Sequence, residues 1–400
     1  MSDGSPPQKT VAGRFRPREP IGSGGFGSVW RAVDEQGGPD VAIKFPLNSG
    51  TNDRSEVRAR FRNECELLDQ FGEGIHPTSL IRCIDSRSRD PMYAVLEYIR
   101  GPTLSERVNG KPAGVDAIDR FGVPVVRALE FLHRNGFCYQ DCRPENVLVR
   151  KGSDSPVLID FNTAEPTNSA DTLFHEDGFK APEQTPPESE KAAPGPWSDV
   201  YAAGKLFVYL LTGQRVPHED TPERGINVSE YGIDVPESIH QLIQQATHAD
   251  QSQRPRTAGE LLTQLYRQLD GDTAIAELID TRRNTRCPVR PGYTVGRIGE
   301  SDDLPDIAAA DSKQYVSPNH FEIDRDEESW LLRDRSLNGT WIAAGEQWQQ
   351  LLSETGYHQL QREAPERAPN EQPYVAGHLY DGTEIALVDP SYKIRMTFST

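Results

Sequence analysis

The spacing of hydrophobic residues changes twice along the chain. Residues 15–86 contain short strand-like runs separated by turns, and one helix-like run, residues 56–71, interrupts them. The spacing then becomes helical over residues 104–134 and again over 199–269, with short apolar strands such as VLV at 147–149 between them. A small strand-rich lobe followed by a larger helical lobe predicts an α+β bilobal fold.

After about residue 280 the pattern becomes that of an all-β sandwich. Strand-like segments separated by turn residues recur there: YTVGRI, HFEIDR, SWLLRD, GTWIA, TEIALVD and YKIRMTF. We therefore expect a multidomain chain with the following parts: a flexible N-terminal lead at 1–13, an α+β domain at 14–272, a linker at 273–290, and an all-β domain at 291–400 with a long loop insertion at about 343–378.

Composition excludes several classes of function. The 400 residues carry a formal net charge of −18, divided into −6 for residues 281–400 and −12 for the rest. Neither part therefore predicts a binder of nucleic acid or of an anionic membrane. The longest apolar stretch, residues 201–212, contains a lysine and is too short to span a bilayer. Because the five cysteines form no CxxC pair and the N-terminus has no signal-peptide core, we expect a cytoplasmic protein.

The first group of candidate functional residues is a glycine-rich turn followed by a lysine. Gly22, Gly24 and Gly27 form G-x-G-x-x-G, which is a weak signal by itself. A dinucleotide fold requires a helix directly after the glycines, whereas SVWRAV is strand-like and places Val29 where it can pack on a flat base. A glycine hairpin of this kind lets backbone N–H groups approach phosphate oxygens closely.

Lys44 lies on the next apolar strand, in VAIK. A lysine on such a strand is costly unless an anion meets it, and nucleotide phosphates or a helix carboxylate would both serve. Glu64, 20 residues later, shares the inward helix face with Phe61 and Leu68. Glu64 is therefore one candidate partner for Lys44, beside nucleotide phosphates.

These motifs, with those that follow them, resemble the eukaryotic-type (Hanks-type) Ser/Thr protein kinase family over about residues 14–270. The set is specific because its members must occur in a fixed order. They occur here in that order: the glycine loop, VAIK, Glu64, Asp141 with Asn146, Asp160, Ala181-Pro182-Glu183, and Ser198-Asp199-Val200-Tyr201.

The resemblance implies a role for each matching residue. Asp141 would orient the substrate hydroxyl and accept its proton, and Arg143 would face the transferring phosphate where the family usually has Lys. Asn146 and Asp160 would hold Mg²⁺ or Mn²⁺. The residues implied to bind ATP are Gly22, Gly24, Gly27, Val29, Ala42, Lys44, Glu97 and Ile99, the last two in a hinge that bonds adenine through its backbone. Glu183 and Arg254 match the family's structural ion pair.

Two positions depart from the family pattern. His-Arg-Asp of the family is Tyr139-Gln140-Asp141 here, and Gln140 replaces an arginine that usually grips an activation-loop phosphate. Asp-Phe-Gly becomes Asp-Phe-Asn, with Asn162 in place of the glycine. The first change argues against loop phosphorylation as the main switch. Two alternatives to an active protein kinase stay open: a pseudokinase that serves as an ATP-binding scaffold, and a small-molecule kinase, which Ala181-Pro182-Glu183 disfavours.

The C-terminal strands resemble a forkhead-associated (FHA) domain over about residues 287–400. Gly296-Arg297, Ser317-Pro318-Asn319-His320 and Asn338-Gly339-Thr340 occur in the family's order. The resemblance implies that Arg297 and Ser317 hold phosphothreonine oxygens, that Asn338 bonds the ligand backbone, and that His320 braces a loop. Leu337 stands where many phosphate binders have a polar residue, so a degenerate FHA domain is the alternative.

Together these resemblances predict a cytoplasmic signalling enzyme, an ATP-dependent protein serine/threonine kinase. It would transfer the ATP γ-phosphate to Ser or Thr hydroxyls of protein substrates. The FHA domain would bind phosphothreonine proteins, including this chain itself, to recruit substrates or to regulate the kinase. The competing hypothesis is a phosphopeptide-binding adaptor with a vestigial kinase.

Overall fold

A computed structural model of the chain describes all residues except 1–9, 25–26, 48–53, 73, 168–177, 185–192, 218–219, 269–272, 300–302, 312, 328, 344 and 346. The chain forms two compact units. The first comprises Met1–Glu73 and Ser79–Leu261, and the second comprises Gly74–Thr78 and Leu262–Thr400. Among the described residues, no helix is both long enough and apolar enough to cross a membrane.

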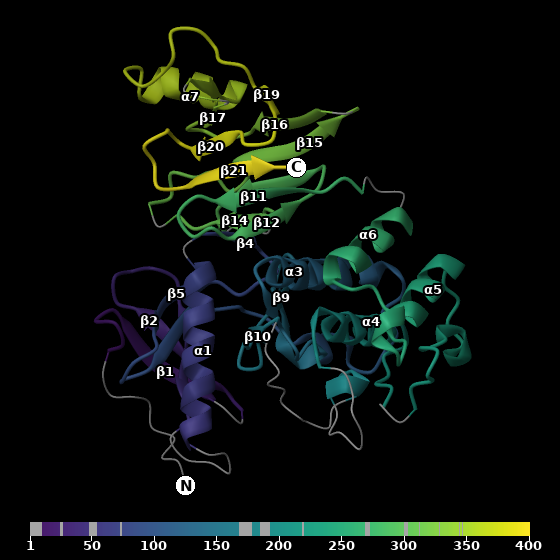
Figure 1. The fold of residues 1–400 in the computed structure, drawn as a ribbon. Coiled ribbons are helices and arrows are strands. Elements are labelled where there is room, and N and C mark those ends of the chain that lie inside the picture. Colours follow the sequence, from purple (N-terminus) through teal and green to yellow (C-terminus); the bar gives the residue numbers. More distant parts are fainter. Residues whose placement is uncertain are drawn as a thin grey trace. The chain divides into compact units, whose positions relative to one another are not determined.

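An antiparallel sheet with the order β1-β2-β3-β6-β5 forms the N-terminal part of the first unit. Its strands are β1 (Phe15–Ser23), β2 (Gly27–Asp34), β3 (Val41–Pro46), β5 (Cys83–Arg87) and β6 (Tyr93–Glu97). Alternating apolar residues of these strands bury one face, and Val11, from the expected flexible lead, packs in the same cluster. Helix α1 (Arg54–Gly72) lies beside β5 (Figure 1).

Helices dominate the rest of the first unit. They are α2 (Leu104–Val108), the π-helical turn Ile118–Gly122, α3 (Val123–Arg134), α4 (Pro196–Thr212) and α5 (Glu237–Ala246). The division between the units falls within α6 (Ala258–Gln268). Helix α4 is almost wholly buried, which explains its largely apolar sequence.

Two short antiparallel strand pairs frame the loop that carries the expected catalytic residues. Strand β7 (Phe137–Cys138) pairs with β10 (Glu165–Pro166), and β8 (Val147–Val149) pairs with β9 (Pro156–Leu158). The loop from residue 139 to 146 therefore begins and ends at hydrogen-bonded strands, which fix its backbone at both ends. Four short 3-10 turns are also described in this unit: Pro144–Asn146 at the end of this loop, Pro182–Gln184, Val228–Tyr231, and Gln251–Gln253 before α6.

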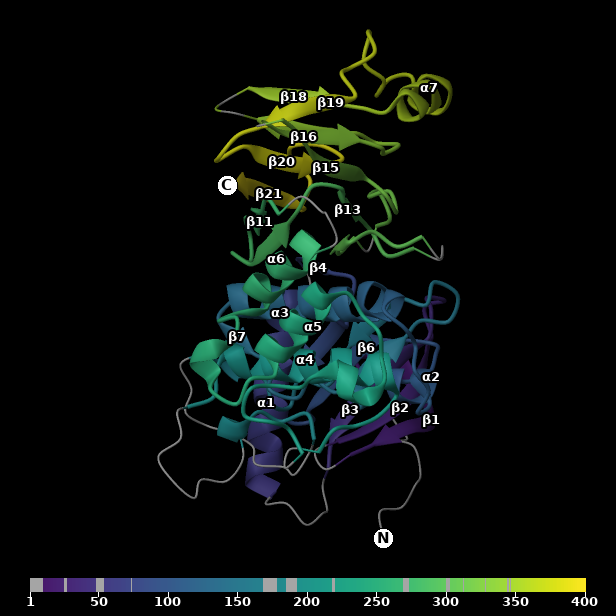
Figure 2. The same cartoon turned by 90° about the vertical axis from the view of Figure 1, so that its right-hand side faces the viewer.

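The second unit contains two six-stranded sheets, with the orders β12-β11-β21-β20-β17-β18 and β19-β16-β15-β13-β14-β4. The strands of the first sheet are β11 (Ala276–Asp280), β12 (Arg286–Val289), β17 (Thr340–Ala343), β18 (Trp348–Leu351), β20 (Glu384–Leu387) and β21 (Arg395–Ser399). Those of the second are β4 (Ile75–Pro77), β13 (Tyr293–Gly296), β14 (Ile307–Ala309), β15 (Phe321–Asp326), β16 (Ser329–Asp334) and β19 (Ala376–Leu379). Trp330 of β16 meets Phe398 of β21 across the interior, at 5.7 Å between ring centroids. The two sheets form the predicted all-β sandwich (Figure 2).

Several stretches expected to be irregular hold regular structure. The expected linker at 273–290 contains β11 and β12, because Ala276, Leu278 and Val289 alternate into the sandwich core. The expected loop at 343–378 contains β18, helix α7 (Glu354–Glu363) and β19. Strand β4, which lies between α1 and β5 in the sequence, belongs to the second sheet of the sandwich and pairs with β14.

Candidate active site and phosphate-binding loops

The glycine hairpin between β1 and β2 lies directly against the expected lysine. The Gly24 N–H donates to the Gly27 carbonyl across the turn at 2.9 Å. A Cβ at Gly27 would lie 2.9 Å from the Phe45 carbonyl and 3.3 Å from Cε of Lys44, so this position requires glycine. Val29 is opposite Lys44 in the β2–β3 register. The sequence motif therefore folds into a turn whose backbone closely approaches Lys44.

Three charged side chains from separate elements meet at Lys44. Nζ of Lys44 donates to Oε1 of Glu64 at 2.6 Å and to Oδ1 of Asp160 at 2.9 Å. Lys44 and Glu64 are buried, at 5% and 1% exposure, whereas the Asp160 side chain is 41% exposed. Strand β3, helix α1 and the turn after β9 thus place one ammonium between two carboxylates.

The environment of this cluster perturbs both buried groups. Burial opposes the charged form of Lys44, but the Asp160 and Glu64 carboxylates outweigh that effect, so the pKa of Lys44 is raised. Burial also raises the pKa of Glu64, in opposition to the attraction of Lys44. Oε2 of Glu64 is buried without a hydrogen-bond partner among the described residues, while Oε1 also accepts from the Phe161 N–H at 3.2 Å. Lys44 therefore stays charged throughout the physiological pH range.

The loop at 139–146 brings together Asp141 and Asn146. Nδ2 of Asn146 donates to Oδ2 of Asp141 at 2.7 Å and to its carbonyl at 3.0 Å. Arg143 lies on the same loop, with Nε 3.6 Å from Oε2 of Glu145. Glu145 also forms an ion pair with Arg215. The loop therefore holds the Asp141 carboxylate against the Asn146 amide. Arg143 does not take part in this contact and instead pairs with Glu145.

A buried aspartate on α4 holds the backbone of this loop. Oδ2 of Asp199 accepts from the Tyr139 N–H at 2.8 Å, and Oδ1 accepts from the Gln140 N–H at 2.7 Å. Asp199 is fully buried, and His133 Nε2 lies 2.9 Å from Oδ2. Tyr139 packs edge-on against Phe161, at 5.4 Å between ring centroids. The loop is therefore fixed from both its backbone and its side-chain faces.

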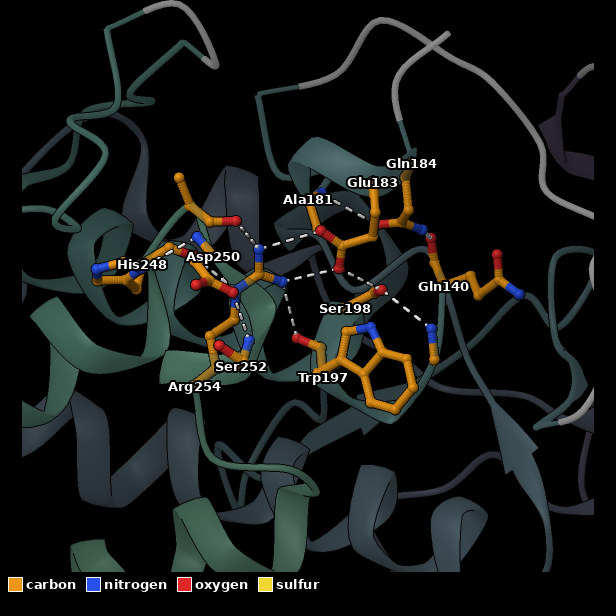
Figure 3. A network of polar contacts seen from close by, with 12 residues as sticks. Gln140, Ala181, Glu183, Gln184, Trp197, Ser198, His248, Asp250, Ser252 and Arg254 are labelled. Atoms are coloured by element: carbon orange, nitrogen blue, oxygen red, sulfur yellow. Dashed lines mark hydrogen bonds and ion pairs between the residues drawn. The ribbon is translucent and has the colours of Figure 1, made fainter. Parts of the chain in front are cut away.

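The expected structural pair of Glu183 and Arg254 is present. Nη1 and Nη2 of Arg254 donate to the two carboxylate oxygens of Glu183 at 2.8 and 3.0 Å, and Ser198 donates to Oε1 at 2.7 Å (Figure 3). The Arg254 side chain is fully buried, and a bidentate arginine–carboxylate pair with additional partners is the arrangement that buried charges require.

Lys180 is a residue near Asp141 that sequence reasoning did not single out. Its Nζ donates to the Gln140 carbonyl at 2.7 Å and lies 3.5 Å from Oδ1 of Asp141. Gln184 Nε2 donates to the same carbonyl at 3.1 Å (Figure 3). Lys180 directly precedes Ala181-Pro182-Glu183. A lysine among apolar neighbours is the sequence signal that could have indicated this buried cation.

The remaining expected nucleotide-binding residues lie on or beside the N-terminal sheet. Ala42 of β3 pairs with Leu96 of β6, and Glu97 is opposite Val41. The Glu97 carboxylate accepts two hydrogen bonds from Nη2 of Arg150, at 2.9 and 3.0 Å. Ile99 follows β6 and is buried. The Glu97 carboxylate is therefore occupied by a structural pair, and its N–H donates to the Arg82 carbonyl at 3.0 Å.

The ligand oxygens of Asp160 and Asn146 suit a hard divalent cation. Asp160 and Asn146 present carboxylate and amide oxygens, the ligand types that Mg²⁺ prefers. In the described part of the chain, no group of three or more His, Cys, Asp or Glu side chains forms a metal cage. Mg²⁺ is commonly held by one or two protein oxygens together with substrate phosphates, so a site of few ligands fits it.

Three loops of the C-terminal unit bring Arg297, Ser317 and the Leu337–Asn338 turn together. The Arg297 N–H donates to the Ser317 carbonyl at 3.1 Å, and the Leu337 N–H donates to Oγ of Ser317 at 3.1 Å. Asn338 Nδ2 donates to the Tyr315 carbonyl at 2.8 Å. Nε of Arg297 is buried and has no hydrogen-bond partner among the described residues. A strongly polar guanidinium in this setting is suited to an anionic ligand.

His320 connects two of these loops from below. Its Nδ1 accepts from the Ser317 N–H at 3.1 Å, and its Nε2 lies 3.0 Å from the Gly339 carbonyl, to which only an N–H can donate. The ring is fully buried, and burial lowers the pKa of His320 to about 4. The neutral ring with the proton on Nε2 satisfies both contacts, so His320 braces the loops as the resemblance implied.

Comparison with known proteins supports both parts of this description. Residues 15–268 match the family model described as a protein kinase domain, and residues 293–363 match that of an FHA domain. The serine/threonine-protein kinase PknA of Nostoc sp. is 28% identical over 276 residues, which cover 64% of this chain and 48% of that protein.

Two further curated proteins and one solved structure are also similar to this chain. Serine/threonine-protein kinase D of Synechocystis sp. is 31% identical over 225 residues (52% of this chain, 42% of that protein), and PrkC of Bacillus subtilis is 27% identical over 279 residues (66% and 42%). The chain thus spans less than half the length of these relatives. A solved structure titled PpkA-294, apo form, has a TM-score of 0.52 and 24% identity, covering 66% of this chain and 100% of its own. That likeness shows the fold.

Proposed function

The chain belongs to the protein kinase family, and we propose that it transfers the γ-phosphate of Mg-ATP to Ser or Thr hydroxyls of proteins. The observation that carries this proposal is the cluster of Lys44, Glu64 and Asp160, in which one buried ammonium contacts carboxylates from two other elements at 2.6 and 2.9 Å. The relatives PknA and PrkC, named as serine/threonine-protein kinases, support the choice of acceptor.

In this proposal Lys44 binds the nucleotide phosphates from the sheet side. Its raised pKa keeps the ammonium charged, and Glu64 holds it in place. With nucleotide bound, Asp160 would give up its contact with Lys44 and hold the metal, and the Lys44 ammonium would then face the phosphate oxygens. The glycine hairpin supplies backbone N–H groups above the phosphates. Mg²⁺, held by Asp160 and Asn146, would neutralise charge on the phosphate oxygens.

The acceptor hydroxyl would be oriented by Asp141. Because Asn146 fixes Oδ2 of Asp141, the carboxylate has a defined direction in which it can accept a hydrogen bond from a Ser or Thr hydroxyl. The hydroxyl oxygen attacks the γ-phosphorus, the bond to the β,γ-bridging oxygen breaks, ADP leaves, and the hydroxyl proton passes to Asp141. Arg143 is the cation we assign to the developing charge, once it leaves Glu145.

We further propose that the C-terminal unit binds phosphothreonine peptides, from protein substrates or from this chain itself. Arg297, whose buried Nε has no hydrogen-bond partner among the described residues, would bond the phosphate oxygens together with Ser317. Asn338 would bond the peptide backbone. Binding would raise the local concentration of a tethered substrate at the kinase. We place the protein in the cytoplasm, which five buried cysteines outside any disulfide support.

A phosphoryl-transfer assay tests the kinase proposal. Wild type and Asp160→Ala are incubated with radiolabelled ATP, Mg²⁺ and a generic protein substrate, and incorporated phosphate is measured. Wild type is expected to exceed the variant by at least 100-fold, because the variant loses the metal-binding carboxylate. Equal incorporation would contradict the enzyme hypothesis and favour an ATP-binding scaffold, which nucleotide binding by the wild type would then reveal.

A peptide-retention experiment tests the second proposal. A phosphothreonine peptide library is passed over immobilised wild type and over Arg297→Ala. Wild type should retain phosphorylated peptides and release their unphosphorylated counterparts, whereas the variant should retain neither. Retention by both proteins, or by neither, would refute the assignment and leave a degenerate FHA domain.

A further inference from the structure

Lys180 is buried beside the proposed catalytic aspartate, although it lies on a different segment. The residue is 3% exposed, and its Nζ donates to the Gln140 carbonyl at 2.7 Å while lying 3.5 Å from Oδ1 of Asp141. An ammonium at this depth is stable only when oxygen atoms replace its water. Both of the oxygens that do so belong to the loop at 139–146, so the position of Lys180 is tied to that loop.

The two oxygens of the Asp141 carboxylate are therefore held from different directions. Oδ2 accepts from Asn146 at 2.7 Å, and Oδ1 faces the Lys180 ammonium at 3.5 Å. The Asp141 side chain is 24% exposed, so part of it stays open to an incoming hydroxyl. Rotation about the Cβ–Cγ bond of Asp141 would break one contact or the other.

Lys180 also fixes the peptide that leads into Asp141. Gln140 has φ of 66°, a left-handed conformation that is unfavourable for a residue with a side chain. Its N–H donates to Asp199 at 2.7 Å, and its carbonyl accepts from Lys180 at 2.7 Å. The same carbonyl accepts from Gln184 at 3.1 Å (Figure 3). Such a conformation persists only when its surroundings impose it, and Lys180 supplies the shorter of the two bonds to the carbonyl.

We propose that Lys180 is a positioning residue that sets the direction of the Asp141 carboxylate for phosphoryl transfer. The inference rests on the proposed kinase activity and deepens it, because the residue acts through Asp141 and through the Gln140 peptide. Its effect belongs to the chemical step: the residue contacts neither Lys44 nor Asp160 in any described hydrogen bond or ion pair. Loss of Lys180 should therefore lower kcat and leave the KM for ATP unchanged.

Steady-state kinetics of Lys180 variants test this inference in the full chain. Lys180→Met should lower kcat by about 10- to 100-fold with the KM for ATP within threefold of wild type, because a misdirected carboxylate no longer orients the hydroxyl. Lys180→Arg should restore at least part of kcat, since it keeps the charge and a donor. Lys205→Met is the matched control: Lys205 is also 3% exposed but donates to Thr221, so its kcat should equal that of wild type.

Three outcomes would overturn the inference: a kcat for Lys180→Met within threefold of wild type, a loss confined to the KM for ATP, or an equal loss in Lys205→Met. If circular dichroism shows that Lys180→Met does not fold, Lys180→Gln decides, since it keeps a donor for the Gln140 carbonyl and removes the charge. It should show the same fall in kcat, and wild-type kcat would contradict the inference. Wild-type protein no more active than Asp160→Ala would instead refute the kinase proposal itself.

Discussion

Individual residues in this chain combine charge with burial at the points where chemistry is proposed. Lys44 and Glu64 are 5% and 1% exposed and lie 2.6 Å apart, and such pairs contribute little net stability while the loss of one partner is costly. The residue types alone predicted an anion beside Lys44, because an apolar strand lysine requires one, and the kinase resemblance singled out Glu64. The sequence could not predict that Asp160 would also contact Lys44, since that depends on how the turn after β9 folds.

A double-substitution experiment separates the structural and chemical roles of this pair. Lys44→Met leaves the Glu64 charge buried and should lower the free energy of unfolding by about 3 kcal/mol, and it should abolish phosphoryl transfer. Adding Glu64→Leu should restore most of the stability, because no unpaired charge remains, but none of the activity. Urea unfolding and the radiolabelled assay measure the two effects. Activity in the double variant would show that Lys44 does not bind phosphate.

His320 makes the C-terminal unit sensitive to acid. Its folded pKa of about 4 lies below the ordinary value of 6.5, so below pH 6.5 the unfolded chain binds a proton that the folded chain excludes. Stability should therefore fall as the pH drops from 6.5 to 4, by at most about 3 kcal/mol, and be unaffected by His320 above pH 7. Thermal unfolding of wild type and His320→Gln across this range tests the sign. If the stability of both proteins changed identically with pH, the result would contradict a role of His320 in this acid sensitivity.

At the scale of elements, hydrophobic periodicity predicted the strands and helices with strong amphipathic patterns. Alternation over YTVGRI, HFEIDR and SWLLRD correctly predicted strands of the sandwich. The strands β11 and β12 were missed, because the Arg-rich residues between them mark a tight turn that resembles a linker. Helix α7 was missed because its polar, Gln-rich sequence buries only Gly356 and Leu360.

Helix α7 is connected to the loop that precedes Leu337 and Asn338. The Ser353 N–H donates to Oδ1 of Asp334 at 2.8 Å, and its hydroxyl donates to the Ser336 carbonyl at 2.6 Å and accepts from the Gly356 N–H at 3.0 Å. Ser353 is thus an N-cap and a brace for that loop. The insertion therefore has a structural link to the proposed phosphothreonine site that its composition did not indicate.

Removal of the Ser353 cap should weaken peptide binding, although we do not expect Ser353 to contact the peptide. Ser353→Ala is expected to lower the stability of the C-terminal unit by about 1 kcal/mol and to weaken phosphothreonine-peptide affinity several-fold, because the loop loses its anchor. Ser391→Ala is the control, since in the described part of the chain its hydroxyl bonds only the nearby, half-buried Asp389 carboxylate. Fluorescence anisotropy measures affinity. Equal affinities of both variants would show that α7 does not brace the site.

At the scale of the whole molecule, the second unit is built from two distant parts of the sequence. Strand β4 pairs with β14, and the Thr78 N–H donates to the Asp306 carbonyl at 3.0 Å while the Ala310 N–H donates to the Gly74 carbonyl at 3.2 Å. A domain boundary drawn from composition alone could not include residues 74–78, because a three-residue strand has no pattern of its own. The sandwich is incomplete without them.

A fragment that lacks β4 should reveal this dependence. In a fragment of residues 262–400 the β14 edge is unpaired, and exposed edges lose protection and promote association. Hydrogen exchange should show a fast Ala310 amide in the fragment and a protected one in the full chain. The Arg297 amide, which bonds the Ser317 carbonyl within the fragment, serves as the internal control. Equal protection of Ala310 in both proteins would contradict the assignment of β4 to this sheet.

Net charge over the whole chain does not reveal the individual cations at the proposed sites. The protein carries −18 overall, yet we propose that two of its sites bind phosphate groups. Recognition must therefore depend on a few buried or half-buried cations, Lys44 in one unit and Arg297 in the other, and not on a diffuse positive field. This explains why composition excluded nucleic acid as a partner but could not indicate nucleotide or phosphopeptide binding.

Mass spectrometry of the intact protein after incubation with Mg-ATP tests the central claim most directly. The account predicts that wild type gains whole phosphoryl groups, that peptide mapping places them on Ser or Thr, and that Asp160→Ala gains none. The same measurement reports any phosphothreonine that the C-terminal unit could bind. If the wild type, supplied also with a generic protein substrate, adds no phosphoryl group to itself or to that substrate, or if Asp160→Ala adds as many, the chain is not an active protein kinase.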